Sequence, residues 1–261
     1  MATSVYTLIT GASGGIGREL AGIFASHGHS LVLAARSIDK MEKIKSGLEE
    51  KYGVPVYCFM FDGTRQGAAR DLYESVNAAG LTIDILVNNA GFGWKGSFAD
   101  MPENEILDMI NLNIVTLSQL ARLFLPGMIE RKAGKILNIG STASFQPGPE
   151  VTVYYASKAY VLSFSEALAE ELRNTGVSVT ALCPGPTNTG FQKRANMDRT
   201  VAFNSLFMMN SRKVAETGYH ALMKGRPLVI PGLINRTGAF AVRFLPRSIV
   251  PRMVRKIHRD I

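Results

Sequence analysis

The stretch from Val153 to Tyr160 reads VYYASKAY and brings two tyrosines close to one lysine. A tyrosine hydroxyl has a pKa of about 10, so it exchanges protons at neutral pH only where a neighbouring cation favours the phenolate. In a helix, Tyr154 lies four residues before Lys158 and Tyr155 lies three before it, so both can share a face with the lysine. The pattern predicts a Tyr–Lys acid–base pair, and helix geometry alone leaves both tyrosines open.

Further polar residues occur inside apolar stretches. Ser141 ends the apolar run ILNIG, where its hydroxyl can bind a substrate oxygen, and Ser144 three residues later is a weaker rival. Asn138 lies within the same run and is expected to point away from the site. Asparagine is unfavourable inside a helix and costly when buried without partners, yet Asn111 and Asn113 both lie in the helical pattern LDMINLNIVTLSQL.

The elements that must position these residues alternate strictly between β and α. Unbroken apolar runs predict strands at Val5–Thr10, Ser30–Ala35, Val54–Phe61, Ile83–Asn88, Gly134–Gly140, Val177–Cys183 and Pro227–Ile230. Helical patterns lie between them at Ile16–Ser26, Asp39–Lys51, Gln66–Ala79, Glu103–Glu130 and Val153–Asn174. The alternation predicts a single α/β domain over residues 1–261, with a doubly wound parallel sheet whose ligand lies beyond the carboxyl ends of the strands.

A glycine-rich turn, TGASGGIGREL, follows the first predicted strand and opens a helix. Glycines there let the backbone approach a pyrophosphate, and the helix N-terminus offers free N–H groups. The spacing is G-x3-G-x-G, which differs from the common dinucleotide fingerprint G-x-G-x-x-G. The turn predicts a dinucleotide site contacted by Gly11, Ser13, Gly14, Gly15, Ile16 and Gly17.

The end of the second strand indicates which dinucleotide binds. An acid here would hold a ribose 2′-hydroxyl, but the chain has Arg36, whose guanidinium suits a 2′-phosphate. Asp39 falls late and is expected to serve the next helix. Arg36 therefore predicts NADP(H) over NAD(H) as the cofactor. After the third and fourth strands, Asp62 is expected to accept from the adenine amino group, and the motif VNNAG supplies cofactor contacts at Asn89, Ala90 and Gly91.

The amides of Asn88 and Asn89 have two possible roles. They can bracket the ends of strands, or they can contact the ligand, because buried amides need several hydrogen bonds each. The sequence leaves both open.

Taken together, these motifs resemble the short-chain dehydrogenase/reductase family, in its single-domain branch of about 250 residues. TGASGGIG, NNAG, Asn113, Ser141, the Tyr154/Lys158 pair and PGPTNT occur in one order over about 180 residues. The resemblance covers Val5 to about Ile230. It implies a Rossmann fold with a seven-stranded sheet of order 3-2-1-4-5-6-7, a nicotinamide cofactor and hydride transfer at a carbonyl carbon.

The resemblance also implies a role for each catalytic residue. The family's Y-x-x-x-K pattern, and a serine 13 residues before the tyrosine, select Tyr154 as the acid/base. Lys158 is expected to lower the pKa of Tyr154 and to hold the ribose, while Ser141 orients the carbonyl. Asn113, 28 residues before Ser141, is expected to hold a water of a proton relay through a distorted backbone. One departure is Thr116, where the family often has glycine.

Other contacts follow from the same resemblance. PGPTNT is expected to line the cofactor site through Pro184, Gly185, Thr187 and Thr189, the last holding the nicotinamide carboxamide, together with Tyr154 and Lys158. Residues 191–212 correspond to the family's substrate lid, and their methionines and aromatics either receive an apolar substrate or pack a loop helix. The predicted substrate contacts are Phe92, Trp94, Phe145, Gln146 and Phe191.

Composition limits the class of protein. The chain is 46% apolar without an 18-residue apolar run, so we expect no membrane-spanning helix. Cys58 and Cys183 have no metal-ligand or redox spacing and are expected to be reduced core residues of a cytoplasmic protein, with no metal site. The net charge of +8 lies wholly in Lys224–Ile261, which holds nine basic residues and one acid. This distribution is not typical of a nucleic-acid enzyme.

The C-terminal extension, residues 233–261, interleaves apolar and basic residues, with Pro246 and Pro251 breaking it into short pieces. It can pack as a last helix, complete a dimer interface, or contact an anionic membrane surface peripherally.

We therefore predict an NADP(H)-dependent oxidoreductase of an apolar ketone, aldehyde or secondary alcohol, as a homodimer or homotetramer. The alternative is an NADPH-binding regulatory or membrane-surface protein on the same fold without turnover.

Overall fold

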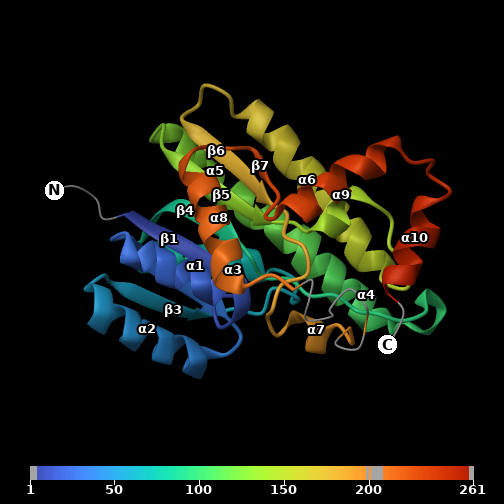
Figure 1. The fold of residues 1–261 in the computed structure, drawn as a ribbon. Helices are drawn as coiled ribbons and strands as arrows, with labels where there is room; N and C mark the ends of the chain where they lie inside the picture. Colours follow the sequence, from blue (N-terminus) through green and yellow to red (C-terminus); the bar gives the residue numbers. More distant parts are fainter. Residues whose placement is uncertain (1–4, 198–199, 201–207, 259–261) are drawn as a thin grey trace.

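The computed structural model describes residues 5–197, 200 and 208–258. Its strands form one parallel sheet, and the observed order β3-β2-β1-β4-β5-β6-β7 confirms the predicted topology (Figure 1). The strand bounds are β1 (Val5–Thr10), β2 (Ser30–Ala35), β3 (Val56–Met60), β4 (Thr82–Asn88), β5 (Gly134–Ile139), β6 (Val177–Leu182) and β7 (Leu228–Val229). The third and seventh strands are shorter than the apolar runs that predicted them.

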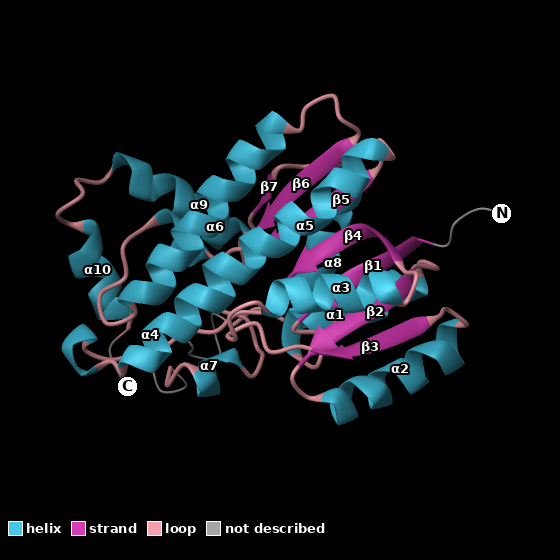
Figure 2. Ribbon diagram, turned by 180° about the vertical axis from the view of Figure 1, so that it is seen from behind, coloured by secondary structure: helices cyan, strands magenta, loops and turns pink. Residues whose placement is uncertain are grey.

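Helices cover both faces of the sheet, as Figures 1 and 2 show from opposite sides. One face carries α1 (Gly15–Ser26), α2 (Ile38–Tyr52) and α8 (Ser211–Met223). The other carries α3 (Ala68–Ala78), α5 (Leu117–Glu130) and α6 (Thr152–Glu171). The chain therefore has the doubly wound arrangement that strict β–α alternation predicts.

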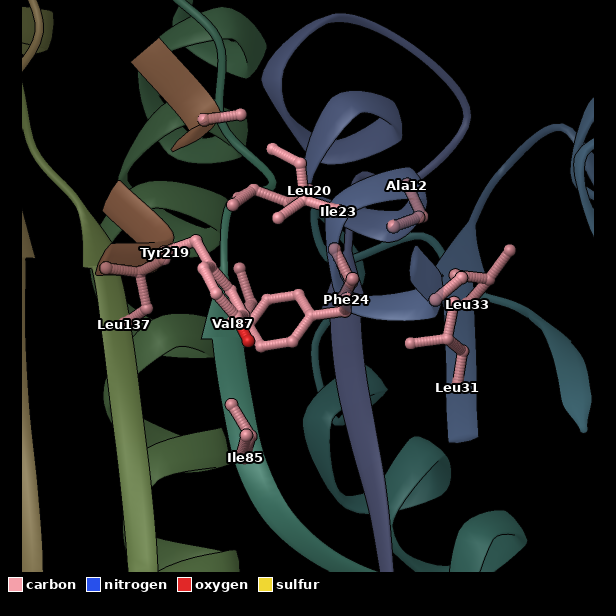
Figure 3. Close-up of a cluster of buried hydrophobic side chains, with 14 of the residues drawn as sticks. Ala12, Leu20, Ile23, Phe24, Leu31, Leu33, Ile85, Val87, Leu137 and Tyr219 are labelled. Carbon is pink, nitrogen blue, oxygen red and sulfur yellow. The ribbon is translucent and has the colours of Figure 1, made fainter. Parts of the chain in front are cut away.

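Each face has its own apolar core. In β1, Ile9 packs under the first set of helices and Leu8 under the second, because successive side chains of a strand point to opposite faces. Figure 3 shows the first core, where Phe24 of α1 meets Tyr219 of α8 edge to face, with ring centroids 5.0 Å apart. Burial on both faces fixes the strands, and with them the loops at their carboxyl ends.

The long helical pattern Glu103–Glu130 is interrupted. It forms α4 (Glu103–Ile110), a π-helical segment at Asn111–Thr116, and α5. The change of helix type does not break the run: within the described residues, Glu103–Glu130 is long and apolar enough to cross a membrane by length and composition, with a mean hydropathy of 1.3 in its 18-residue window. Leu120, Ala121 and Phe124 of this helix are buried against the sheet, and 39% of its apolar window is buried inside the protein.

The region of the predicted lid is described only in part. It begins with the short helix α7 (Phe191–Arg194) and ends where Asn210 caps α8, accepting from the backbone N–H of Arg212 at 2.9 Å. Phe203, Leu206 and Phe207, expected in the lid, lie outside the described residues.

The C-terminal extension folds as short helices, as its prolines predict. These are α9 (Leu233–Ala241), a 3-10 turn at Val242–Phe244 and α10 (Val250–Ile257). Pro246 lies between the turn and α10. Pro251 instead occupies the first turn of α10, where a missing N–H has no intrahelical partner to lose.

Candidate active site

A cleft of about 800 Å³ lies at the carboxyl ends of the strands, where open parallel sheets bind ligands. Sixteen of the seventeen predicted cofactor residues line it, and Gly17 does not. The lining ones are Gly11, Ser13, Gly14, Gly15, Ile16, Arg36, Asp62, Asn89, Ala90, Gly91, Tyr154, Lys158, Pro184, Gly185, Thr187 and Thr189. Ser141, Phe92, Gln146 and Phe191 lie in the same cleft. The sequence motifs therefore converge on one site.

The glycine turn forms a cradle that fits a dinucleotide. Gly11 and Gly15 have φ of +66° and +53°, a region that favours glycine. A Cβ on Gly14 would meet nothing within 4 Å, and this residue begins α1 without a side-chain cap. The first N–H groups of α1 are thus open to a phosphate. Gly17 serves packing instead, because a Cβ there would lie 2.5 Å from the Gly11 carbonyl oxygen.

Both strand-end amides bracket strands. Asn89 donates from Nδ2 to the carbonyl oxygens of Thr10 at 2.9 Å and Gly11 at 3.2 Å, so it ties the glycine turn to β4. Asn88 faces the core and donates to Asn138 at 2.9 Å. Asn138 in turn donates to Ser165 at 2.9 Å, which confirms that it points away from the cleft. Of the two strand-end amides, Asn89 alone lines the cleft.

Charged groups lie where the adenine end of a dinucleotide is expected. Arg36 is exposed at the end of β2 and lines the cleft, and the described residues place no carboxylate in an ion pair with it. Asp39 occupies the first turn of α2, as expected. Asp62 lines the cleft, and its Oδ1 accepts from the Thr64 hydroxyl at 2.9 Å. A guanidinium without an acidic partner fits a phosphate at this position.

Tyr154, Ser141 and Lys158 meet at the end of β5. The Tyr154 hydroxyl lies near Ser141, whose side chain opposes part of the rise in the pKa of Tyr154. Nζ of Lys158 lies 5.8 Å from the centroid of the Tyr154 ring and donates to the carbonyl oxygen of Ile139 at 2.7 Å. Helix α6 supplies the tyrosine and the lysine one turn apart, and the Ser141 hydroxyl comes from the adjoining strand end. The three groups can bind one carbonyl oxygen and give it a proton.

The rival residues have other partners. The Tyr155 side chain is buried, and its hydroxyl is hydrogen-bonded to Nε2 of His258 at 2.6 Å. Ser144 donates to the backbone carbonyl of Lys158 at 2.7 Å and accepts from the N–H of Ser141. Both residues support the geometry of the site, and Tyr154 and Ser141 both line the cleft.

Burial reverses the expected shift of the tyrosine. The sequence predicts a lowered pKa for Tyr154, but burial raises it to about 12, partly offset by the hydrogen bond with Ser141. Burial also lowers the pKa of Lys158 to about 8. The Tyr154 hydroxyl is therefore protonated at neutral pH, which suits a proton donor to a developing alkoxide.

Asn113 is buried in the π-helical segment and holds the loop after β4. Its Oδ1 accepts from the N–H of Phe92 at 3.2 Å, while its Nδ2 donates to the Phe92 carbonyl at 2.9 Å and to Ser157 at 3.0 Å. Thr116, where the family often has glycine, donates to the Gly63 carbonyl at 2.8 Å. The expected backbone distortion is present as this π segment, a feature frequent at functional sites. The water relay stays a prediction.

Two predicted substrate contacts lie outside the cleft and are corrected. The Trp94 ring covers Gly96, where an added Cβ would lie 2.3 Å from the ring, and packs with Met101 and Met109. Phe145 packs with Leu162 and Cys183 in a small core cluster. Both follow a strand in the chain, but position after a strand does not fix side-chain direction.

The C-terminal extension contributes cleft residues that the motifs do not indicate. They are Ile234, Asn235, Gly238, Ala239, Ala241, Val242, Leu245, Met253, Ile257 and His258. His258 is buried, and its Nδ1 has no hydrogen-bond partner within the described part of the chain. The sequence of the extension shows only that apolar and basic residues alternate, and this pattern does not indicate that the extension lines the cleft.

We expect His258 to make the free energy of unfolding depend on pH. Burial lowers its pKa to about 4, with Glu150 opposing and Lys95 reinforcing the shift. As the pH falls, His258 takes up its proton in the unfolded chain, at a pKa near 6.5, before it does so in the folded protein. The free energy of unfolding that it contributes above pH ~6.5 is therefore lost as the pH falls toward ~4. Urea unfolding should show a loss of about 2 kcal/mol between pH 7 and pH 5 that His258→Gln abolishes.

The matched control is His220→Gln on the exposed face of α8. It should retain the acid-dependent loss. Equal losses in wild type and His258→Gln would contradict the assignment.

Comparison with known proteins identifies the family. The profile described as short chain dehydrogenase matches residues 6–200. The human very-long-chain 3-oxoacyl-CoA reductase is 40% identical over 185 residues, 69% of this chain and 58% of that protein. This chain thus matches little more than half the length of that relative.

Solved structures agree with this match. A short-chain dehydrogenase from Sphingobium yanoikuyae in complex with NADPH has a TM-score of 0.82 at 32% identity, covering 92% of this chain and 93% of that one. The bulky-bulky ketone specific alcohol dehydrogenase from Comamonas testosteroni has a TM-score of 0.78 at 28% identity, covering 95% and 97%. The chain therefore belongs to the short-chain dehydrogenase/reductase family.

Proposed function

We propose that this oxidoreductase uses NADPH to reduce a ketone in an apolar substrate to a secondary alcohol. The observation that carries the proposal is the meeting of Ser141, Tyr154 and Lys158 in a cleft that continues to the glycine turn. NADPH, when bound, supplies the hydride. Ser141 donates a hydrogen bond to the carbonyl oxygen, Tyr154 donates the proton, and the Lys158 ammonium stabilises the phenolate left behind.

A 3-oxoacyl thioester is the first candidate substrate. The name of the human relative supports this class, since that protein is a 3-oxoacyl-CoA reductase. Apolar side chains on the substrate side of the cleft also support it, including Phe92, Phe191, Met197, Val242, Leu245 and Met253. A bulky ketone is the second candidate, supported by the Comamonas relative and by the cleft volume of about 800 Å³.

The test follows NADPH oxidation against matched panels. One panel contains 3-oxoacyl-CoA esters of increasing chain length, and the other contains aldehydes, cyclic ketones and sterol ketones. The thioester proposal expects kcat/KM to rise with chain length, by about 3- to 4-fold for each buried CH₂. A higher kcat/KM for sterol ketones than for every thioester would replace the first candidate with the second.

Arg36 is proposed to select NADP(H) over NAD(H), because a guanidinium forms paired, charge-assisted hydrogen bonds with a phosphate. Arg36→Ala should weaken NADPH binding by roughly 10- to 100-fold and leave NADH binding within about twofold. Calorimetric titration of both cofactors measures this. Arg70→Ala, an exposed arginine on α3, is the control. Equal weakening of both cofactors would remove the 2′-phosphate role from Arg36.

The proposed homo-oligomer uses the outer faces of α4, the π-helical segment, α5 and α6. Exposed apolar side chains there include Leu107, Val115, Ile129 and Tyr160. Tyr160 is joined to Ser118 of α5 by a 2.8 Å hydrogen bond between their hydroxyls, so the two helices present one surface. Sedimentation equilibrium tests this face, with Val115→Asp expected to give monomers.

A further inference from the structure

The C-terminal extension lies at one end of the molecule, beside α6 and away from the α2–β3 edge, as Figures 1 and 2 both show. Four large apolar side chains on it face solvent: Leu233, Ile234, Phe240 and Phe244 are 75%, 79%, 60% and 73% exposed. The rings of Phe240 and Phe244 contact each other, with centroids 5.1 Å apart. An exposed apolar patch of this kind marks an interaction surface.

The same surface is strongly basic. Exposed cations accompany the patch at Arg236, Arg243, Arg247, Arg252, Arg255 and Lys256. Within residues 5–197, 200 and 208–258, the ion pair seen for this group is Arg255 with Glu150, at 3.5 Å. Helix α10 shows the pattern compactly: Val250 and Val254 are buried inward, while Met253 and its basic neighbours face outward.

The patch is continuous with the substrate side of the cleft. Ile234 is largely exposed and also lines the cleft, as do Leu245, Met253 and Ile257. His258 fixes the end of this segment to Tyr155, next to the catalytic tyrosine. An apolar molecule held against the patch would therefore reach the reacting groups along an apolar path.

We propose that the surface formed by α9, the turn Val242–Phe244 and α10 docks on an anionic lipid bilayer. Aromatic and aliphatic side chains enter the interface, and arginine stems extend their charged groups to lipid phosphates. Each cation held near an anionic surface adds to the attraction between the protein and the bilayer. With the surface docked, the cleft would face the bilayer, so an apolar substrate could enter the cleft from the bilayer without crossing water.

Charge argues against a second copy of the chain as the occupant. In a two-fold interface, the same patch meets itself, so the six cations of one copy would face six of the other. Like charges brought together at an interface oppose association. An anionic bilayer matches both the charge and the apolar character of the surface.

The experiment is sedimentation of the full chain, with NADPH and without substrate, on vesicles of phosphatidylcholine alone or with 30 mol% phosphatidylglycerol, roughly the anionic content that attracts basic segments. Binding is expected with the anionic vesicles and should weaken at least tenfold on raising the salt. Phe240→Ser/Phe244→Ser and Arg243→Gln/Arg247→Gln should each lower the partition coefficient at least tenfold. None of these four residues lines the cleft.

Controls come from the opposite edge of the molecule. Met60→Ser removes an exposed apolar side chain of β3, and Lys43→Gln/Arg70→Gln removes two exposed cations of α2 and α3. These variants should bind vesicles like wild type. NADPH affinity and thermal unfolding check that every variant is folded.

Three outcomes would overturn the proposal. They are no binding of wild type to anionic vesicles, equal losses in the control variants, and a solution dimer that Phe240→Ser/Phe244→Ser dissociates. Because no substrate is present, failure of docking is separate from failure of the proposed reductase activity.

Discussion

Tyr154→Phe should reduce kcat for ketone reduction by roughly 10³-fold, the effect of losing a positioned general acid. Phenylalanine keeps the ring against Phe191, whose centroid lies 5.1 Å away, so the packing of the cleft is retained. The variant loses the hydroxyl that lies near Ser141 and that we propose as the proton donor. NADPH affinity, measured by fluorescence titration, should change by less than about threefold, because one neutral hydroxyl contributes little net binding.

Tyr155→Phe is the matched control, one residue away on the same helix. It breaks the hydrogen bond with His258, so it should cost about 1–3 kcal/mol in unfolding free energy. Most of kcat should remain. If Tyr155→Phe lost turnover while Tyr154→Phe retained it, the assignment of Tyr154 as the proton donor would be contradicted.

Lys158→Met should reduce kcat by about 10²-fold, equivalent to roughly 2.7 kcal/mol of transition-state stabilisation. Methionine has similar length and fills the buried site, but it supplies no cation to the phenolate that forms on Tyr154. Removing a buried ammonium should leave the melting temperature unchanged or higher. Steady-state kinetics and calorimetry measure the two effects separately.

The pH profile distinguishes this electrostatic role from packing. Lys158 has a pKa lowered to about 8, so its ammonium is present below that pH and is lost above it. Reduction by wild type should therefore decline above pH ~8, and Lys158→Met should lack this decline. A wild-type profile that stays level to pH ~10 would contradict a charged lysine in the reaction.

The fold was predictable because the strands are buried on both faces. Val5–Thr10 and Ser30–Ala35 have unbroken apolar runs, and the observed strands have the same bounds. The glycine turn could be recognised from its residue types and spacing, whereas the Ser141–Tyr154 interval could be interpreted only through the resemblance to the family. The choice between Tyr154 and Tyr155 was different: helix spacing allowed both, and the position of His258 accounts for Tyr155.

The rest depends on tertiary contacts that local patterns do not contain. The π-helical segment at Asn111–Thr116 accompanies the bonds of Asn113 to Phe92 and of Thr116 to Gly63. The raised pKa of Tyr154 depends on burial by the assembled cleft, whereas the sequence shows only the nearby lysine. Pairing of Tyr155 with His258 spans 103 residues, so a tail of basic and apolar residues could not be assigned to the cleft.

The most direct measurement is isotope transfer from NADPH deuterated at C4 of the nicotinamide to a 3-oxoacyl-CoA or a bulky ketone. The proposed reductase predicts a product alcohol that carries deuterium on the former carbonyl carbon with wild type. Tyr154→Phe should form this product roughly 10³-fold more slowly while binding the cofactor normally. Normal NADPH binding by wild type without deuterated alcohol from any substrate of the panel would contradict reduction and favour a cofactor-binding regulator.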